Sequence, residues 1–193
     1  MNAAAVLRKR LGQCRFLRDT RGVSGVEFAL VAPVLTVMMV GVIDIGGMVS
    51  TKLDLNASIS TAAAYAQMNA ANVSSTGGAS LASTLSLIVA HARGPSWADA
   101  DVVVNNGPGS SVAAGNRSPR GTASQADFCY CPLKSGTTVT WGVNRSCNAA
   151  CPAGGGGGIA GKFVSLTATR QFTPIFFRSL AAQMSSTALV QTN

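Results

Sequence analysis

The longest apolar run of this chain lies close to its amino terminus. No Asp, Glu, Lys or Arg occurs between Phe28 and Ile43, a stretch of 16 residues. As a helix, residues 23–47 would reach about 37 Å, which exceeds the roughly 30 Å hydrocarbon core of a bilayer. We therefore expect a transmembrane helix over residues 23–47, with one carboxylate near its start, Glu27, and one near its end, Asp44.

Helical periodicity continues beyond this run. Over residues 48–71, apolar side chains recur at spacings of three, four and seven and form one narrow stripe. Its members are Met48, Leu55, Ile59, Ala62, Ala66 and Ala70. The alanine-rich end of the segment also has high helix propensity. We expect an exported amphipathic helix that continues the span, with its stripe packed on the protein's own domain or between subunits.

Residues 72–193 combine helical and strand patterns, and we expect them to form an exported domain. The expected elements are a helix over 81–93, strands over 101–105, 126–133, 137–143 and 162–172, and an amphipathic or irregular segment over 180–190. Glycine- and serine-rich stretches indicate mobile loops at 107–121 and 152–161. The expected fold class is therefore α+β, with a long amino-terminal helix followed by a small antiparallel-sheet domain stapled by disulfides.

Most of the basic excess precedes the apolar run. The formal net charge is +8, and residues 1–21 contribute +5 of it, from six Lys or Arg against one Asp. Basic residues next to a span favour the cytoplasmic side. We expect residues 1–22 to be a cytoplasmic leader and the chain after the span to be exported. No basic stripe with interleaved aromatic residues follows, so nucleic acid is not an expected partner.

Four of the five cysteines cluster on the exported side: Cys129, Cys131, Cys147 and Cys151. An even number of cysteines in an exported domain indicates two disulfides. On a strand, Cys129 and Cys131 would face the same way, so each is expected to bond to one of the later pair. Which of them bonds to which stays open. A Cys₄ zinc site is the alternative, although CxC followed by CxxxC lacks the usual CxxC knuckles.

The residue types of catalytic sites occur without catalytic spacing. The carboxylates after Phe28 number five, and the chain has one histidine, His91. No serine lies in a GxSxG context, and no metal-ligand helix motif occurs. The glycine run at 154–158 lacks the GxxxxGK[ST] pattern that binds phosphate. We expect a protein that is not an enzyme and that holds no cofactor or metal.

Residues 21–28, RGVSGVEF, resemble the amino end of type IV pilin-like proteins. In that class, a membrane peptidase cuts after a glycine, and a glutamate with an aromatic neighbour stands fifth in the mature chain. Counted from Val23, Glu27 is fifth and Phe28 is sixth. With the helix that follows and the late stretch FVSLTATRQFTPIFF, the pattern is similar to the TadE-like pseudopilins of the tight-adherence (Tad, Flp pilus) system. The resemblance covers the first 70 residues well and the late strand loosely.

This resemblance implies a minor pilin of the bacterial inner membrane, with its amino terminus cytoplasmic and its carboxy-terminal domain periplasmic. A prepilin peptidase would cut between Gly22 and Val23, and removal of the leader would precede assembly. The implied partners are other pilin or pseudopilin subunits and Tad inner-membrane assembly proteins, and the implied role is pilus assembly for surface adhesion. Cleavage after Gly25 would make Glu27 only second, so the family spacing favours Gly22.

A glutamate just inside an apolar span is costly unless it meets a cation. Cleavage would create an ammonium group on Val23, and our hypothesis is that Glu27 of one subunit pairs with this amine on its neighbour. The alternative is an uncleaved bitopic protein with a ligand-binding or structural domain in the periplasm.

Overall fold

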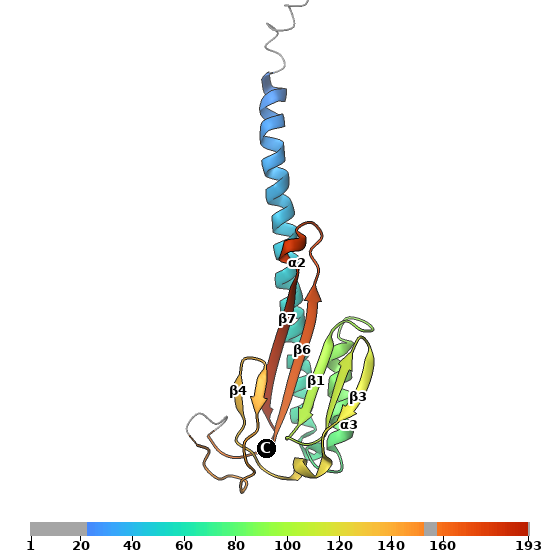
Figure 1. Ribbon diagram of the computed structural model, residues 1–193, viewed down its shortest axis with the longest axis vertical. Helices are drawn as coiled ribbons and strands as arrows, with labels where there is room; N and C mark the ends of the chain where they lie inside the picture. Colours follow the sequence, from blue (N-terminus) through green and yellow to red (C-terminus); the bar gives the residue numbers. More distant parts are fainter. Residues whose placement is uncertain (1–22, 153–157, 193) are drawn as a thin grey trace, which may run out of the picture. The chain divides into compact units, whose positions relative to one another are not determined.

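The computed structural model describes residues 23–152 and 158–192 (Figure 1). The chain divides into two compact units, Met1–Ile45 and Gly46–Asn193, and we call the second unit the head. Helix α2, Val23–Met68, begins in the first unit and ends in the second. It confirms the expected long amino-terminal helix. The leader, residues 1–22, lies outside the described residues.

The head contains a five-stranded antiparallel sheet in the order β3-β2-β1-β6-β7. These strands are β1 (Asp99–Val104), β2 (Gly109–Ala113), β3 (Asn116–Arg120), β6 (Phe163–Phe172) and β7 (Ala182–Gln191). A separate hairpin joins β4 (Leu133–Ser135) to β5 (Thr138–Thr140). The helical elements after α2 are η3 (Ala70–Asn72), α3 (Gly78–Ala90), η4 (Ala123–Asp127) and η5 (Arg178–Leu180). The expected α+β class is therefore confirmed.

One apolar core joins the helices to one face of this sheet. In Figure 1 the large sheet lies in front of α3 and of the part of α2 that belongs to the head. Side chains from α2, α3, β1 and β6 are fully buried together, among them Leu55, Ala62, Ala66, Leu85, Val89, Val102, Val164 and Leu166. The apolar stripe of residues 48–71 therefore packs in the core of its own domain.

The expectation of a mobile loop at 107–121 is wrong, because β2 and β3 form a hairpin there. Its two-residue turn places Ala114 and Gly115 at φ of 49° and 81°, and positive φ at both central positions suits a tight hairpin turn. The Asp99 carboxylate accepts a hydrogen bond from the Ala114 N–H at 2.9 Å. Pairing of β2 with β1 then brings the polar sequence into the sheet. Of the other expected loop, 152–161, residues 153–157 lie outside the described residues.

Two further expectations need correction. The strand expected at 126–133 begins instead with η4, and its middle forms only single bridges, Cys129 with Arg145 and Tyr130 with Gly161. The segment expected to be amphipathic or irregular at 180–190 contains β7. This strand pairs with β6 over its whole length, from Ala182 to Gln191. The strong alternating partner therefore imposes strand structure on a sequence with a weak pattern of its own.

Polar side chains occupy both edges of the sheet. On β7, Lys52 Nζ donates to the carbonyl of Ser185, and Lys134 Nζ donates to the carbonyl of Thr187. At the opposite edge, β3 contains Pro119, which has no N–H to offer. Two carbonyls of the β7 edge are thus occupied, and one N–H is missing from the β3 edge, which hinders pairing with a neighbouring strand at these positions.

Two disulfides staple the segment that follows η4. Cys129 bonds to Cys147 and Cys131 to Cys151, with Cα–Cα distances of 5.1 and 5.6 Å. This confirms that each early cysteine bonds to one of the later pair, and it settles the order. Cys129 and Ala160 lie at the centre of a small second core. The two bonds use all four sulfurs, so none of these cysteines is left as a thiolate for the alternative Cys₄ zinc site.

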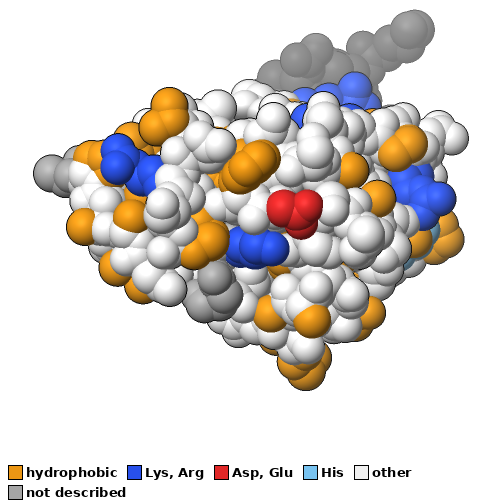
Figure 2. Space-filling view, turned by 90° about the horizontal axis from the view of Figure 1, so that it is seen from below, with side chains coloured by type: hydrophobic (Ala, Val, Ile, Leu, Met, Phe, Trp, Pro, Cys, Tyr) orange, Lys and Arg blue, Asp and Glu red, His pale blue; other side chains and the backbone are white. Residues whose placement is uncertain are grey.

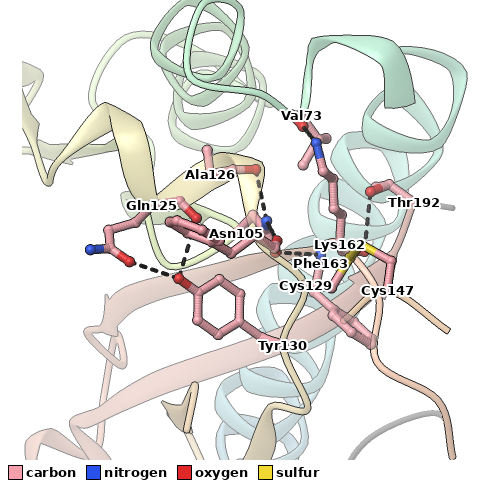
Figure 3. The surroundings of a disulfide bond; sticks show 11 residues. Val73, Asn105, Gln125, Ala126, Cys129, Tyr130, Cys147, Lys162, Phe163 and Thr192 are labelled. Carbon is pink, nitrogen blue, oxygen red and sulfur yellow. Dashed lines mark hydrogen bonds between the residues drawn. A yellow bond between two sulfur atoms is a disulfide. The ribbon is translucent and has the colours of Figure 1, made fainter. Parts of the chain in front are cut away.

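A buried asparagine connects this stapled segment to the main sheet (Figure 3). Asn105 is fully buried, and its Nδ2 donates to the carbonyls of Ala126 at 2.8 Å and Phe128 at 2.5 Å. Its Oδ1 accepts from the Phe163 N–H at 3.2 Å, while its own N–H donates to the Phe163 carbonyl at 2.8 Å. The residue has a φ of 48°, a conformation that asparagine tolerates better than most residues. The Asn105 side chain thus connects η4, the residue that precedes Cys129, and β6.

Replacing this side chain while keeping the backbone conformation tests its role. Asn105→Gly should lower the free energy of unfolding by about 1–3 kcal/mol, since two buried carbonyls lose their donor. The measurement is denaturant unfolding of the full chain in detergent, followed by near-UV circular dichroism. Asn106→Gly is the matched control because Asn106 also has positive φ, at 58°. The control should change stability by less than about 0.5 kcal/mol; equal losses in both variants would contradict the role of the Asn105 side chain.

The disulfide order can be tested with matched pairs of serine substitutions. The double variant Cys129→Ser, Cys147→Ser removes one bond across 18 residues and should cost about 3 kcal/mol of unfolding free energy. The double variant Cys129→Ser, Cys151→Ser changes as many residues but breaks both bonds, so it should be clearly less stable. Thiol titration of the denatured proteins should find two more free thiols in the second variant than in the first. The same thiol count in both would contradict the observed order.

Candidate functional site: the apolar helix and its amino end

The residues expected to act in processing and assembly lie at the start of α2. Val23 is its first residue, and Glu27 and Phe28 follow in its second turn. Both side chains are exposed, and that of Phe28 has 71% of its surface accessible. Gly22 lies outside the described residues. The amino end of the helix therefore exposes an acid and an aromatic ring at two consecutive positions.

Apolar side chains cover all sides of α2 between Phe28 and Ile43, and the buried Asp44 follows this run. Successive helical residues point about 100° apart, so three in a row sample the whole circumference. Val37, Met38 and Met39 are such a triplet, with exposed fractions of 60%, 64% and 70%. The most apolar 18-residue stretch of this helix has a mean hydropathy of 2.3, and only 6% of that stretch is buried. A core helix of a soluble protein would be mostly buried, so this segment is a helix that is long and apolar enough to cross a membrane.

The hydroxyl of Thr36, a polar group inside the apolar segment, is satisfied within the helix. The Thr36 hydroxyl donates to the carbonyl of Ala32, one turn earlier, at 2.8 Å. The helix assignment runs through Pro33 without a break. Beside this proline lies an open apolar hollow of about 390 Å³, lined by Pro33, Val34, Val37 and Met38. Such a surface can be covered by lipid chains or by an apolar side chain of another helix.

The carboxylates of the head are engaged in structural contacts. Asp54 forms an ion pair with Arg93 at 2.5 Å, and Asp101 pairs with Arg120. Asp99 caps the β2–β3 turn through Ala114. These pairs are exposed, so each is expected to contribute little to stability. Each of these three carboxylates contacts a residue of another segment of the head.

Asp127 is the fourth carboxylate of the head. Hydrogen bonds from the Ser75 hydroxyl and the Ser75 main-chain N–H, together with the nearby Lys162 charge, hold the pKa of Asp127 below its ordinary value. The ionised carboxylate of Asp127 therefore links η4 to the turn that precedes α3. On the face that Figure 2 shows, an acidic group lies beside a basic one near the middle, and the other basic side chains stand apart among uncharged ones.

The remaining candidate residues are the four cysteines, which the structure brings together as two disulfides more than 100 residues after Glu27 in the sequence. Within the described part of the chain, no group of three or more His, Cys, Asp or Glu is placed to hold a metal ion. Asn105 was not expected from the sequence. Its only signal was the turn-forming run Asn105–Asn106–Gly107–Pro108, which marks a turn without revealing the long-range hydrogen bonds.

Comparison with known proteins points to the same segment. A family model described as TadE-like protein matches residues 22–64. No curated protein and no solved structure matches the chain. The match begins at Gly22, includes Glu27 and Phe28, and ends where α2 is buried in the head. The amino-terminal segment of this chain is therefore similar to the TadE-like family, as its sequence pattern predicts.

Proposed function

We propose that this chain is a minor pilin, or pseudopilin, that takes part in the assembly of a Tad-type pilus and thereby in surface adhesion. The observation that carries the proposal is the position of Glu27, five residues into a helix whose apolar surface is exposed on all sides. The proposed location is the bacterial inner membrane, with the amino terminus cytoplasmic and the head periplasmic. The basic leader supports this orientation through the positive-inside rule.

The proposed first step is removal of residues 1–22 by a prepilin peptidase. Cleavage after Gly22 gives Val23 a free ammonium group at the start of α2. A carboxylate near the membrane is much less costly when it meets such a cation. In the proposed assembly, Glu27 of one subunit pairs with the Val23 amine of its neighbour and sets the register of the two helices. Phe28 and the apolar hollow beside Pro33 are the surfaces proposed to pack between them.

The proposed partners are the prepilin peptidase, other pilin or pseudopilin subunits and the inner-membrane proteins of the Tad system. A role without catalysis is proposed for the head. It is supported by the engagement of each of the four head carboxylates in a contact that fastens one element to another.

Processing can be tested at the two candidate glycines. Gly22→Val should leave the full-length precursor in the membrane, because the side chain obstructs the proposed cleavage site. Gly25→Ala is the control: a Cβ at Gly25 meets no atom within 4 Å, and α2 readily accepts alanine. Intact-mass measurement of the membrane protein should show loss of residues 1–22 in the wild type and the control. A precursor that persists only in the Gly25 variant would move the cleavage site to Gly25.

Assembly can be tested at the acid itself. Glu27→Val should leave membrane insertion unchanged, since it removes a charge from an apolar segment. It should reduce co-isolation with other pilin subunits at least about ten-fold, because an amine loses its buried partner. Glu27→Asp keeps the charge and should retain part of the assembly. Pili of normal number and normal co-isolation in the Glu27→Val strain would contradict the pairing.

A further inference from the structure

We propose that the loop between β6 and β7, residues 173–181, inserts into the periplasmic interface of the membrane that α2 crosses. The inference rests on the membrane anchoring proposed above and adds a second lipid contact, made by the head. In Figure 1 this loop lies at the end of β6 and β7 opposite to the β4–β5 hairpin. The loop includes the single turn η5.

Large apolar side chains are concentrated and exposed on this loop. The exposed fractions are 74% for Ile175, 53% for Phe176, 38% for Phe177 and 41% for Leu180. Four such side chains thus lie within six residues of the sequence, whereas in the rest of the head, as far as the structure describes it, exposed large apolar residues are scattered along the sequence. Apolar surface gathered in this way marks a site of interaction.

Contacts between the two strands and α2 locate the loop along the helix. Ser186 bonds to Asn56, and the carbonyl of Ser185 accepts from Lys52, four residues earlier on the helix. At the end of β6, the ring of Phe172 lies 3.5 Å from the position that a Cβ on Gly47 would take. The contacts therefore move toward the amino end of α2 as the strands approach their loop.

Gly47 lies two residues after Ile45, the last residue of the first unit. If the apolar segment occupies the bilayer, Gly47 lies by chain connectivity at the bilayer surface. The loop continues the chain beyond Phe172, which itself packs at the level of Gly47. Its apolar residues are thus placed where the head meets lipid headgroups.

The charge of this region fits a phospholipid surface. Residues 171–193 contain no Asp or Glu, and Arg178 stands exposed within the loop. Bulky apolar residues with a neighbouring cation are typical of segments that lie in the headgroup region, where the cation meets lipid phosphate. The competing occupant is the apolar helix of a second subunit. Lipid is favoured because the loop reaches the level of the bilayer surface in a single chain, without a partner.

Depth-dependent fluorescence quenching in vesicles distinguishes these occupants. The full chain, with Cys14→Ser and its disulfides intact, carries one fluorophore on Ile175→Cys and is reconstituted in phosphatidylethanolamine–phosphatidylglycerol vesicles. The vesicles contain lipid with a nitroxide near the headgroup or deep in the acyl chain. Ser118→Cys, on the exposed strand β3, is the control in the head, and Val37→Cys is the control in the span. Near-UV circular dichroism verifies that each labelled protein is folded.

The expected result is roughly two-fold quenching at position 175 by the shallow nitroxide, since interfacial segments lie about 5–10 Å into the headgroup boundary. Quenching at position 118 should be negligible. Equal, weak quenching at positions 175 and 118 would overturn the proposal. So would a signal at 175 that changes with protein-to-lipid ratio but not with nitroxide lipid, because a second subunit would then cover the loop.

The position 37 probe separates this inference from the anchoring on which it depends. Strong quenching there by the deep nitroxide, with none at position 175, would overturn the loop insertion and leave the proposed anchoring intact. Absence of quenching at position 37 would overturn both.

Discussion

An apolar helix surface must be covered, and α2 meets this constraint in two different ways along its length. From Leu55 onward its apolar stripe is buried by the sheet and α3 of the same chain. Between Phe28 and Ile43, the same helix exposes apolar side chains on all sides, and the described residues of its own unit do not cover them. The cover must therefore come from lipid or from other helices. The proposed insertion, pairing and assembly all follow from this one requirement.

The features that sequence reasoning predicted correctly depend on patterns within short stretches of sequence. The long helix follows from an uninterrupted apolar run joined to a stripe of six apolar residues, and β6 follows from the alternation of apolar and polar residues from Val164 to Thr169. The pairing of the early with the later cysteines followed from the two-residue period of an extended chain, which turns Cys129 and Cys131 to the same side. Val23, Glu27 and Phe28 were singled out through their spacing and lie within the segment that the family model matches, while their roles in processing and assembly stay predictions.

The features that were missed depend on distant partners. Strand β7 has a weak alternation and becomes a strand because β6 pairs with all ten of its residues. The β2–β3 hairpin has a turn of Ala114 and Gly115 in place of a typical Asn–Gly turn, and Asp99 supports it from another strand. Asn105 acts across more than 20 residues to Ala126 and Phe128, and across 58 to Phe163. Such contacts exist only once the sheet has formed, so no short window of sequence contains them.

Lys52 of α2 and Lys134 of β4, which bind carbonyls of β7, and Pro119 of β3 limit how copies of this head can associate. An open sheet edge invites the strand of another molecule, and repeated pairing of that kind leads to cross-β aggregates. Here Lys52 and Lys134 occupy carbonyls on one edge, and Pro119 interrupts the donors of the other. In the proposed assembly, these contacts hinder strand-to-strand pairing between heads, and the contacts between subunits are made by the helices, which can slide and separate.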